Sequence, residues 1–104
     1  MHNKFPHLFE PFKISSVHLK NRITMAPLFT AYAHKDGTVS SLTLEHCEEI
    51  AKGGVGMMVV ANAIVDESGS VSKHSLRVDD DRFLPGLSML ADTIKKKMWP
   101  LYSK

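Results

Sequence analysis

Residues 21–30 read Asn-Arg-Ile-Thr-Met-Ala-Pro-Leu-Phe-Thr, a short apolar strand followed at once by a proline-anchored turn. Pro27 lacks a backbone donor for a sheet ladder and holds Ala26 in an extended conformation, so the strand predicted over Arg22 to Met25 stops there. Strands of parallel barrels end in this way where they present backbone groups to a ligand. This stretch therefore predicts an element of the fold and one side of a binding site.

A hairpin and a helix are predicted on either side of this strand. Residues 12–14 and 17–19 alternate apolar and polar side chains around the turn formers Ser15-Ser16, which indicates a small hairpin. Farther on, Ser40 or Ser41 can cap a helix that ends at Gly53-Gly54. The spacing of its apolar residues predicts an inner face with these members: Leu44, Cys47, Ile50 and Ala51.

The second half of the chain repeats the order of strand and helix. Residues 55–60 are apolar on both faces, as in a covered parallel strand, and residues 64–82 are interpreted as a long binding loop. A second helix should begin with the negative charges of Asp79 to Asp81, with Pro85 in its first turn. Its apolar face is predicted to hold Leu87, Leu90, Ala91 and Ile94. The βαβα order implies parallel strands in an α/β fold.

Several separated motifs carry a family resemblance. They are Leu8-Phe9-Glu10-Pro11-Phe12-Lys13-Ile14, Leu19-Lys20, the stretch 21–30, Asp36-Gly37 and Ala51-Lys52-Gly53-Gly54-Val55-Gly56. In this order and spacing, over Leu8 to Lys97, they resemble the start of the Old Yellow Enzyme family of FMN-dependent NADH:flavin oxidoreductases and ene-reductases. The resemblance implies the first βα units of a (β/α)8 TIM barrel, preceded by a short N-terminal hairpin.

The length of the chain sets the expected domain organisation. A complete barrel of this kind takes about 250 residues, whereas the chain has 104, so an incomplete barrel is expected. Residues 1–97 should form the N-terminal part of the FMN-binding domain, with 98–104 a divergent tail in place of the family's third strand. The family's catalytic and phosphate-binding residues would lie beyond residue 104. No catalytic residue is therefore assigned, and the chain alone is expected to be inactive.

The resemblance also implies which residues contact the flavin. Ala26, Pro27, Leu28 and Phe29 match the segment along the flavin ring, although strand core and turn packing would also explain them. At position 29 the family usually has a small residue such as threonine or cysteine, whereas Phe29 offers only its backbone and bulk; Thr30 is a substitute donor. Ala61 and Asn62 match positions near the flavin pyrimidine.

Two side chains near these positions keep two interpretations each. The amide of Asn62 either hydrogen-bonds the flavin or caps the turn after the second strand. Tyr32 either faces the substrate or, as the preferred interpretation, packs within its loop.

Composition and charge exclude several classes of function. The net charge of +2 arises from mixed signs, and the only dense basic run, Lys95 to Lys97, falls at a helix end, so nucleic-acid binding is not expected. The longest apolar run, 55–61, is far shorter than the roughly 20 residues that cross a bilayer. The six histidines lack metal-ligand spacing, so no metal site is assigned. The single cysteine, Cys47, is typical of a reducing compartment and indicates the cytoplasm.

The predicted function is that of the intact parent enzyme. The resemblance implies hydride transfer from NAD(P)H through FMN to an activated, enone-type alkene. Two alternatives remain at this point. One is a stand-alone α/β interaction module that associates, with itself or with another chain, through open strand edges; the other is a non-functional gene remnant.

Overall fold

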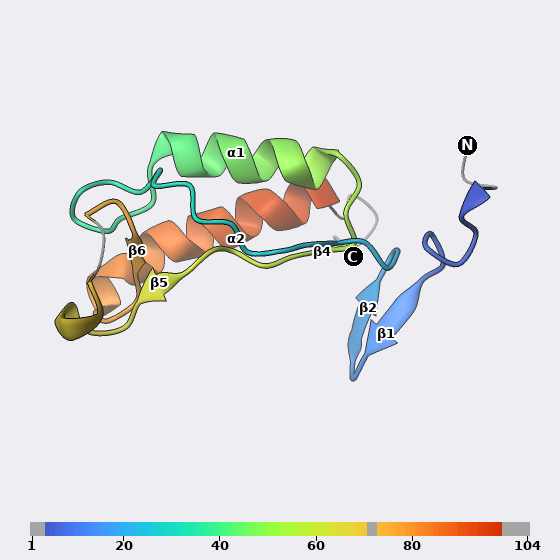
Figure 1. The fold of residues 1–104 in the computed structure, drawn as a ribbon, viewed down its shortest axis with the longest axis horizontal. Helices are drawn as coiled ribbons and strands as arrows, with labels where there is room; N and C mark the ends of the chain where they lie inside the picture. Colours follow the sequence, from blue (N-terminus) through green and yellow to red (C-terminus); the bar gives the residue numbers. More distant parts are fainter. Residues whose placement is uncertain (1–3, 71–72, 99–104) are drawn as a thin grey trace.

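The computed structural model describes residues 4–70 and 73–98 of the chain. Three two-stranded sheets and two helices make up the fold (Figure 1). Strands β1 (Phe12–Ile14) and β2 (Val17–Leu19) form an antiparallel hairpin. Strand β3 (Thr24–Met25) pairs in parallel with β4 (Met57–Met58), and β5 (Ala63–Ile64) pairs in parallel with β6 (Leu76–Arg77). The strands of these described residues form no closed barrel.

The predicted hairpin and the parallel pairing of the two barrel strands are confirmed. In the hairpin, Ser15 has a positive φ of 54°, as the tight turn requires. The parallel strands are shorter than the predicted 22–25 and 55–60, because only Thr24–Met25 and Met57–Met58 pair as a regular ladder. Flanking bonds from Gly56 N to Ile23 O (2.9 Å) and from Val59 N to Met25 O (3.0 Å) continue the same pairing.

A buried amide fixes the start of both parallel strands. Asn21, which is 6% exposed, donates from Nδ2 to the carbonyl of Gly54 (2.7 Å) and accepts the amide proton of Ile23 on Oδ1 (3.0 Å). Gly54 has a φ of 104°, which favours glycine. A Cβ atom at Gly56 would lie 2.4 Å from the Asn21 carbonyl oxygen. The glycine run after the first helix therefore lets the two strand starts approach closely.

The prediction of one long binding loop over residues 64–82 is wrong in that the segment is not a continuous loop. The segment contains β6 and two 3-10 turns, η2 (Glu67–Gly69) and η3 (Asp81–Phe83). Asp79 does not begin the second helix. It instead forms a bidentate pair with Arg77, with Nη2 to Oδ2 at 2.6 Å and Nε to Oδ1 at 3.1 Å. The Arg77 guanidinium accordingly lowers the pKa of the Asp79 carboxyl.

Arg77 holds three chain segments together. Its Nη1 lies 3.0 Å from Glu67 Oε1 in η2, and its backbone amide donates to the Gly37 carbonyl (3.1 Å). The aliphatic part of Arg77 occupies the space that a Cβ at Gly37 would need, because that Cβ would lie 2.3 Å from Arg77 Cγ. A single side chain thus joins the turn at Asp36-Gly37, η2 and β6.

Helices α1 (Ser41–Lys52) and α2 (Leu84–Met98) lie side by side along the strands (Figure 1). The apolar core between them and the strands comprises Ala33, Cys47, Leu76 and Leu90, with Val39, Leu44, Met58 and Ile94 packed against it. Ala91 was predicted to face this core but is exposed. No helix among the described residues is both long and apolar enough to cross a membrane.

The end of α2 is tied to the other elements by two cations. Lys97 Nζ lies 3.5 Å from Glu48 Oε2 on α1. Lys20 Nζ, which follows the hairpin, donates to the carbonyl of Met98 (2.8 Å). This bond satisfies a carbonyl that the helix leaves unpaired at its C-terminus. Met98, assigned from the sequence to the tail, is the buried last residue of α2, and residues 99–104 lie outside the described residues.

Substitutions at Ser40 and Ser41 test which residue caps the start of α1. Ser40, not Ser41, is the N-cap: its Oγ accepts the amide proton of Thr43 (3.1 Å) and donates to the carbonyl of Tyr32. We expect Ser40→Ala to lower the free energy of unfolding by about 1–2 kcal/mol. Urea denaturation followed by circular dichroism measures this loss. Ser41→Ala, on the exposed first turn, is the control, and equal losses in both variants would contradict the assignment.

Candidate functional site

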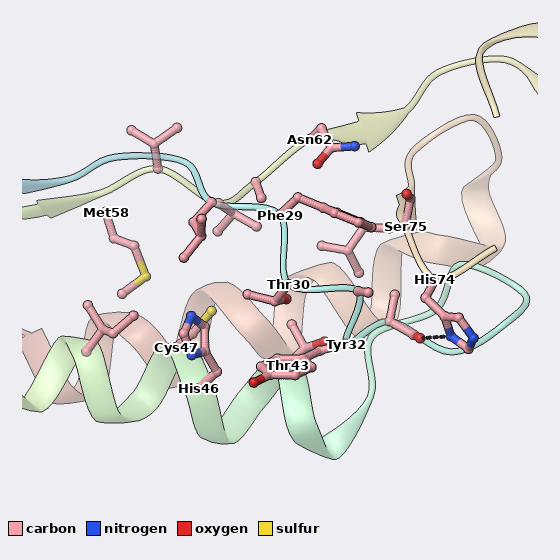
Figure 2. A pocket seen from close by; sticks show the side chains of 18 of the residues that line it. Phe29, Thr30, Tyr32, Thr43, His46, Cys47, Met58, Asn62, His74 and Ser75 are labelled. Atoms are coloured by element: carbon pink, nitrogen blue, oxygen red, sulfur yellow. Dashed lines mark hydrogen bonds between the residues drawn. The ribbon is translucent and has the colours of Figure 1, made fainter. Parts of the chain in front are cut away.

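The ends of the parallel strands meet at a small cavity above α1 (Figure 2). The loop after β3 supplies residues 28–33, the segment after β4 supplies 59–62, and the segment entering β6 supplies 74–76. Five of the seven predicted flavin-contact residues line this cavity: Leu28, Phe29, Thr30, Ala61 and Asn62. The other two, Ala26 and Pro27, are exposed and lie outside it. Parallel pairing of β3 with β4 is what brings the two groups together.

An apolar surface is exposed beside the cavity. Leu28 is 60% exposed, Phe29 47%, Val59 41% and Val60 38%. The backbone amides of Leu28, Phe29 and Thr30 donate to no other described residue. Directly after them, Ala31 has a φ of 60°, a conformation that is uncommon for a residue with a side chain and is often found at functional sites. Apolar bulk next to unused amides suits a flat aromatic ligand with a polar edge.

The size of the cavity decides where such a ligand would lie. Its volume is about 40 Å³, whereas an engineered cavity that binds benzene measures about 150 Å³. A three-ring isoalloxazine would therefore lie on the exposed surface of the strand ends, not inside the cavity. The described lining residues include no lysine or arginine for a phosphate group. A ligand with a phosphate group would need cations from outside this lining.

The two side-chain donors of the predicted site lie on different sides of the cavity. In Figure 2, Asn62 lies beside Phe29 at the strand ends, and Thr30 lies close to α1. Neither side chain makes a hydrogen bond to another described residue. Within residues 4–70 and 73–98, the Asn62 amide therefore caps no turn. The interpretation of Asn62 as a turn cap loses its support. Asn62 is placed better than Thr30 to reach a ring on the exposed surface.

Tyr32 packs against α1, whereas the sequence interpretation placed its packing within its own loop. Its ring meets the His46 ring edge-on, with centroids 5.5 Å apart. The neighbouring thiol of Cys47 lines the same cavity and is 6% exposed, and burial raises its pKa. A thiol with a raised pKa is a weak nucleophile at neutral pH. The α1 side of the cavity is therefore a packing surface.

The sequence did not reveal His74 and Ser75 as parts of the site. His74 Nδ1 lies 2.9 Å from the Ala33 carbonyl oxygen and so joins the β3 loop to the segment entering β6. Ser75 is 3% exposed, and its hydroxyl has no hydrogen-bond partner among the residues that the structure describes. Both residues reach the cavity because β6 pairs with β5. A two-residue ladder leaves too short a pattern in the sequence for its period to be recognised.

Comparison with known proteins connects this arrangement to one family. A profile of the NADH:flavin oxidoreductase / NADH oxidase family matches residues 7–98. An NADH oxidase of Thermoanaerobacter brockii is 36% identical over 91 residues, which are 86% of this chain and 14% of that protein. An NADPH dehydrogenase of Bacillus licheniformis is 37% identical over 89 residues, which are 85% of this chain and 26% of that protein.

Solved structures agree on the fold. The Old Yellow Enzyme of Pichia sp. AKU4542 superimposes with a TM-score of 0.81 at 18% identity, over 88% of this chain and 24% of that one. The chain thus spans about a quarter or less of the length of these similar proteins. At this identity the structural likeness concerns the fold alone.

Proposed function

This chain belongs to the NADH:flavin oxidoreductase / NADH oxidase family, and on that premise we propose that it supplies the first βα units of an FMN-dependent NAD(P)H oxidoreductase barrel. Its part in that enzyme is one wall of the flavin site. The chemistry that FMN would supply when bound is hydride transfer from NAD(P)H to the β-carbon of an activated alkene, with a proton added at the neighbouring carbon. The remainder of the barrel would provide the phosphate site and the groups that hold the substrate.

One observation carries the proposal. Residues 28–30 and 61–62, which are far apart in the sequence, come together at the ends of two parallel strands with exposed apolar side chains and unused donors. In parallel α/β folds the ligand lies at this end of the strands. Leu28 and Phe29 would support one face of the ring, while the Asn62 amide and nearby backbone amides would bind its polar edge.

The single thiol of the chain supports a cytoplasmic location, which we propose for the enzyme. Cys47 is buried and unpaired, and a free cysteine fits the reducing cytoplasm. We therefore place the enzyme there.

Joining the chain to the rest of a related barrel tests the proposed function. Residues 1–98, which end with α2, would be fused to the part of the Bacillus licheniformis NADPH dehydrogenase that follows the matched region. We expect this joined protein to bind FMN and to oxidise NADPH only when an enone is added under anaerobic conditions. A well-folded joined protein that binds no FMN would contradict the proposal. FMN binding without enone reduction would refute the alkene substrate only.

Phe29 should set the flavin reduction potential in the joined protein. A side chain that donates to the ring's O4 region stabilises the negative charge of the reduced ring, and Phe29 has no such donor. We expect Phe29→Thr to raise the potential by roughly 20–60 mV, the equivalent of one hydrogen bond of about 1–3 kcal/mol in a two-electron couple. Equilibration with a reference dye measures the potential.

Val65→Thr is the matched control, because Val65 is 73% exposed and lies outside the cavity. Its potential should equal that of the unmodified joined protein. Equal potentials in the Phe29 variant as well would mean that position 29 does not reach the ring.

A further inference from the structure

A second and larger pocket lies beside the strand pair β5–β6. Its volume is about 290 Å³, close to the lower end of the range for small-molecule sites, which begins at about 300 Å³. We call it the lysine pocket. Its polar lining residues are Lys35, Glu67, Ser70, Lys73, Ser75 and Arg77. The lysine pocket therefore suits a small polar group, whereas the cavity at the strand ends is mainly apolar.

Segments that hold one another in place form the walls of the lysine pocket. Strand β6 has a neighbour on each side, because Val78 N donates to the Ile64 carbonyl (2.9 Å) and Arg77 N donates to the Gly37 carbonyl (3.1 Å). The Arg77 side chain also holds η2 through Glu67 (3.0 Å). Neither β3 nor β4 contributes a lining residue, so the pocket does not depend on what lies at the outer edge of β4.

The charges at the lysine pocket leave two lysines without a partner. Arg77 already lies 2.6 Å from Asp79 Oδ2 and 3.0 Å from Glu67 Oε1. Lys35 and Lys73 are exposed, and neither forms an ion pair with another described residue. Three cations against two carboxylates give this group a net charge of +1. Such a pocket attracts an anion and repels a metal cation.

Unused hydrogen-bond donors accompany these charges. The Ser75 hydroxyl is buried and has no partner among the residues that the structure describes, although a buried hydroxyl without a partner costs free energy. The Arg77 guanidinium has more N–H groups than its bonds to Asp79 and Glu67 use, so it keeps donors for a ligand. The pocket thus offers ammonium, guanidinium and hydroxyl donors.

This donor set matches a phosphate group better than a carboxylate. Lysine and arginine donate charge-assisted hydrogen bonds to phosphate, and lysine does so as a point charge that accepts many directions of approach. The donors here come from two separate places, because Lys35 precedes the Asp36-Gly37 turn while the others lie in β6 or just before it. A carboxylate presents both of its oxygens in one plane. A tetrahedral phosphate presents oxygens on several sides and can contact both places at once.

We propose that the lysine pocket is a binding site for a phosphate group, held by Lys35, Lys73 and the Ser75 hydroxyl. The phosphate of FMN belongs to the remainder of the barrel under the proposed function, so this is a second site. Ser75 also lines the cavity at the strand ends. The group is therefore either a free phosphate ion or the phosphate of a longer ligand that extends from that cavity.

Titration of the isotope-labelled 104-residue chain with inorganic phosphate, followed by NMR at constant ionic strength, tests the proposal. We expect saturable shifts at the backbone amides of Lys35, Lys73 and Ser75. Lys35→Gln and Lys73→Gln should each raise the dissociation constant by about threefold or more, because each removes a charge-assisted hydrogen bond. Both lysines are exposed, so these variants should keep the fold.

Lys96→Gln is the control for a general loss of positive charge. Lys96 is exposed in the last turn of α2, and this end of α2 lies away from β5 and β6 (Figure 1). The Lys96 variant should bind phosphate like the original chain. An equal rise in the dissociation constant for all three lysine variants would overturn the proposal, as would an original chain without saturable shifts.

Ser75→Ala separates a ligand contact from a structural role. It removes a buried hydroxyl that has no described partner, so the thermal midpoint without phosphate should stay the same or rise. The dissociation constant for phosphate, in contrast, should rise by about threefold or more because a donor is lost. An unchanged dissociation constant would contradict the proposed contact with Ser75.

A comparison of NADPH with NADH in the joined protein identifies the source of the phosphate, and this comparison alone rests on the proposed function. NADPH carries a 2′-phosphate that NADH lacks. If that group occupies the lysine pocket, Lys35→Gln should raise KM for NADPH by about threefold or more and leave KM for NADH unchanged. If the pocket takes the free ion, both KM values should stay unchanged. The titration uses the isolated chain, so its result stands whether or not the joined protein binds FMN.

Discussion

Replacing Gly56 by alanine should prevent the chain from folding. A Cβ atom at this position would lie 2.4 Å from the Asn21 carbonyl oxygen and 2.6 Å from Asn21 Oδ1. Neither atom can retreat, because the Asn21 side chain is held by the Gly54 carbonyl and the Ile23 amide. The strand starts would have to separate and lose these bonds inside the fold. We expect a loss of about 3 kcal/mol or more, which is large against the total stability of a small domain.

Thermal denaturation of the Gly56→Ala chain, followed by circular dichroism, measures this effect. Gly69→Ala is the matched control, because nothing lies within 4 Å of a Cβ at Gly69 and its φ is not in the left-handed region. The control should melt like the original chain. A cooperative melt of the Gly56 variant at the original temperature would show that Asn21 and Gly56 do not approach as described.

The second large effect concerns the affinity for FMN of the isolated chain and of the joined protein. We expect the 104-residue chain to bind FMN weakly or not at all, whereas the joined protein should bind it tightly and in a one-to-one ratio. The reason is that the described cavity residues include no cation for the phosphate and form only one wall for the ring. Quenching of FMN fluorescence during a titration distinguishes the two results.

Riboflavin, which lacks the phosphate, serves as the control ligand. If the joined protein gains affinity mainly through a phosphate site, it should prefer FMN to riboflavin by a large factor, while the isolated chain should show no preference. Tight one-to-one binding by the isolated chain would contradict the view that the site is only one wall.

Local signals in the sequence predicted much of the fold. Ser15-Ser16 placed the hairpin turn, the serine pair placed the start of α1 within one residue, and Pro85 lies in the first turn of α2 as expected. The glycine run between α1 and β4 also ended the helix as predicted. Each of these features depends on the conformation of a few neighbouring residues, which is why the sequence was sufficient.

Two kinds of feature escaped the sequence: side-chain pairs between near neighbours that replace a predicted helix start, and contacts between residues far apart in the sequence. Asp79 appeared to begin a helix, yet Arg77 binds it as an ion partner while Asp80 Oδ1 caps η3 through the amide of Arg82 (2.9 Å). The β5–β6 pair has no local pattern, because two residues show no period. Asn21 was only the residue before the predicted strand, but its role requires Gly54 and Gly56, more than thirty positions later.

The residues of the candidate site also fall into two groups: those that the sequence predicted and those that it did not. Leu28, Phe29, Thr30, Ala61 and Asn62 were named from motifs that follow two strands, and parallel pairing brings them to one cavity. His74 and Ser75 join them only through β6, so their presence depends on tertiary structure. Whether the first group contacts a flavin stays a prediction.

A crystal structure of the joined protein with FMN tests the central claim most directly. The isoalloxazine should lie against Leu28 and Phe29 at the ends of β3 and β4, with its pyrimidine edge within hydrogen-bond distance of the Asn62 amide. An isoalloxazine bound elsewhere in the barrel, out of contact with residues 28–30 and 61–62, would contradict the assignment of this chain as one wall of the flavin site.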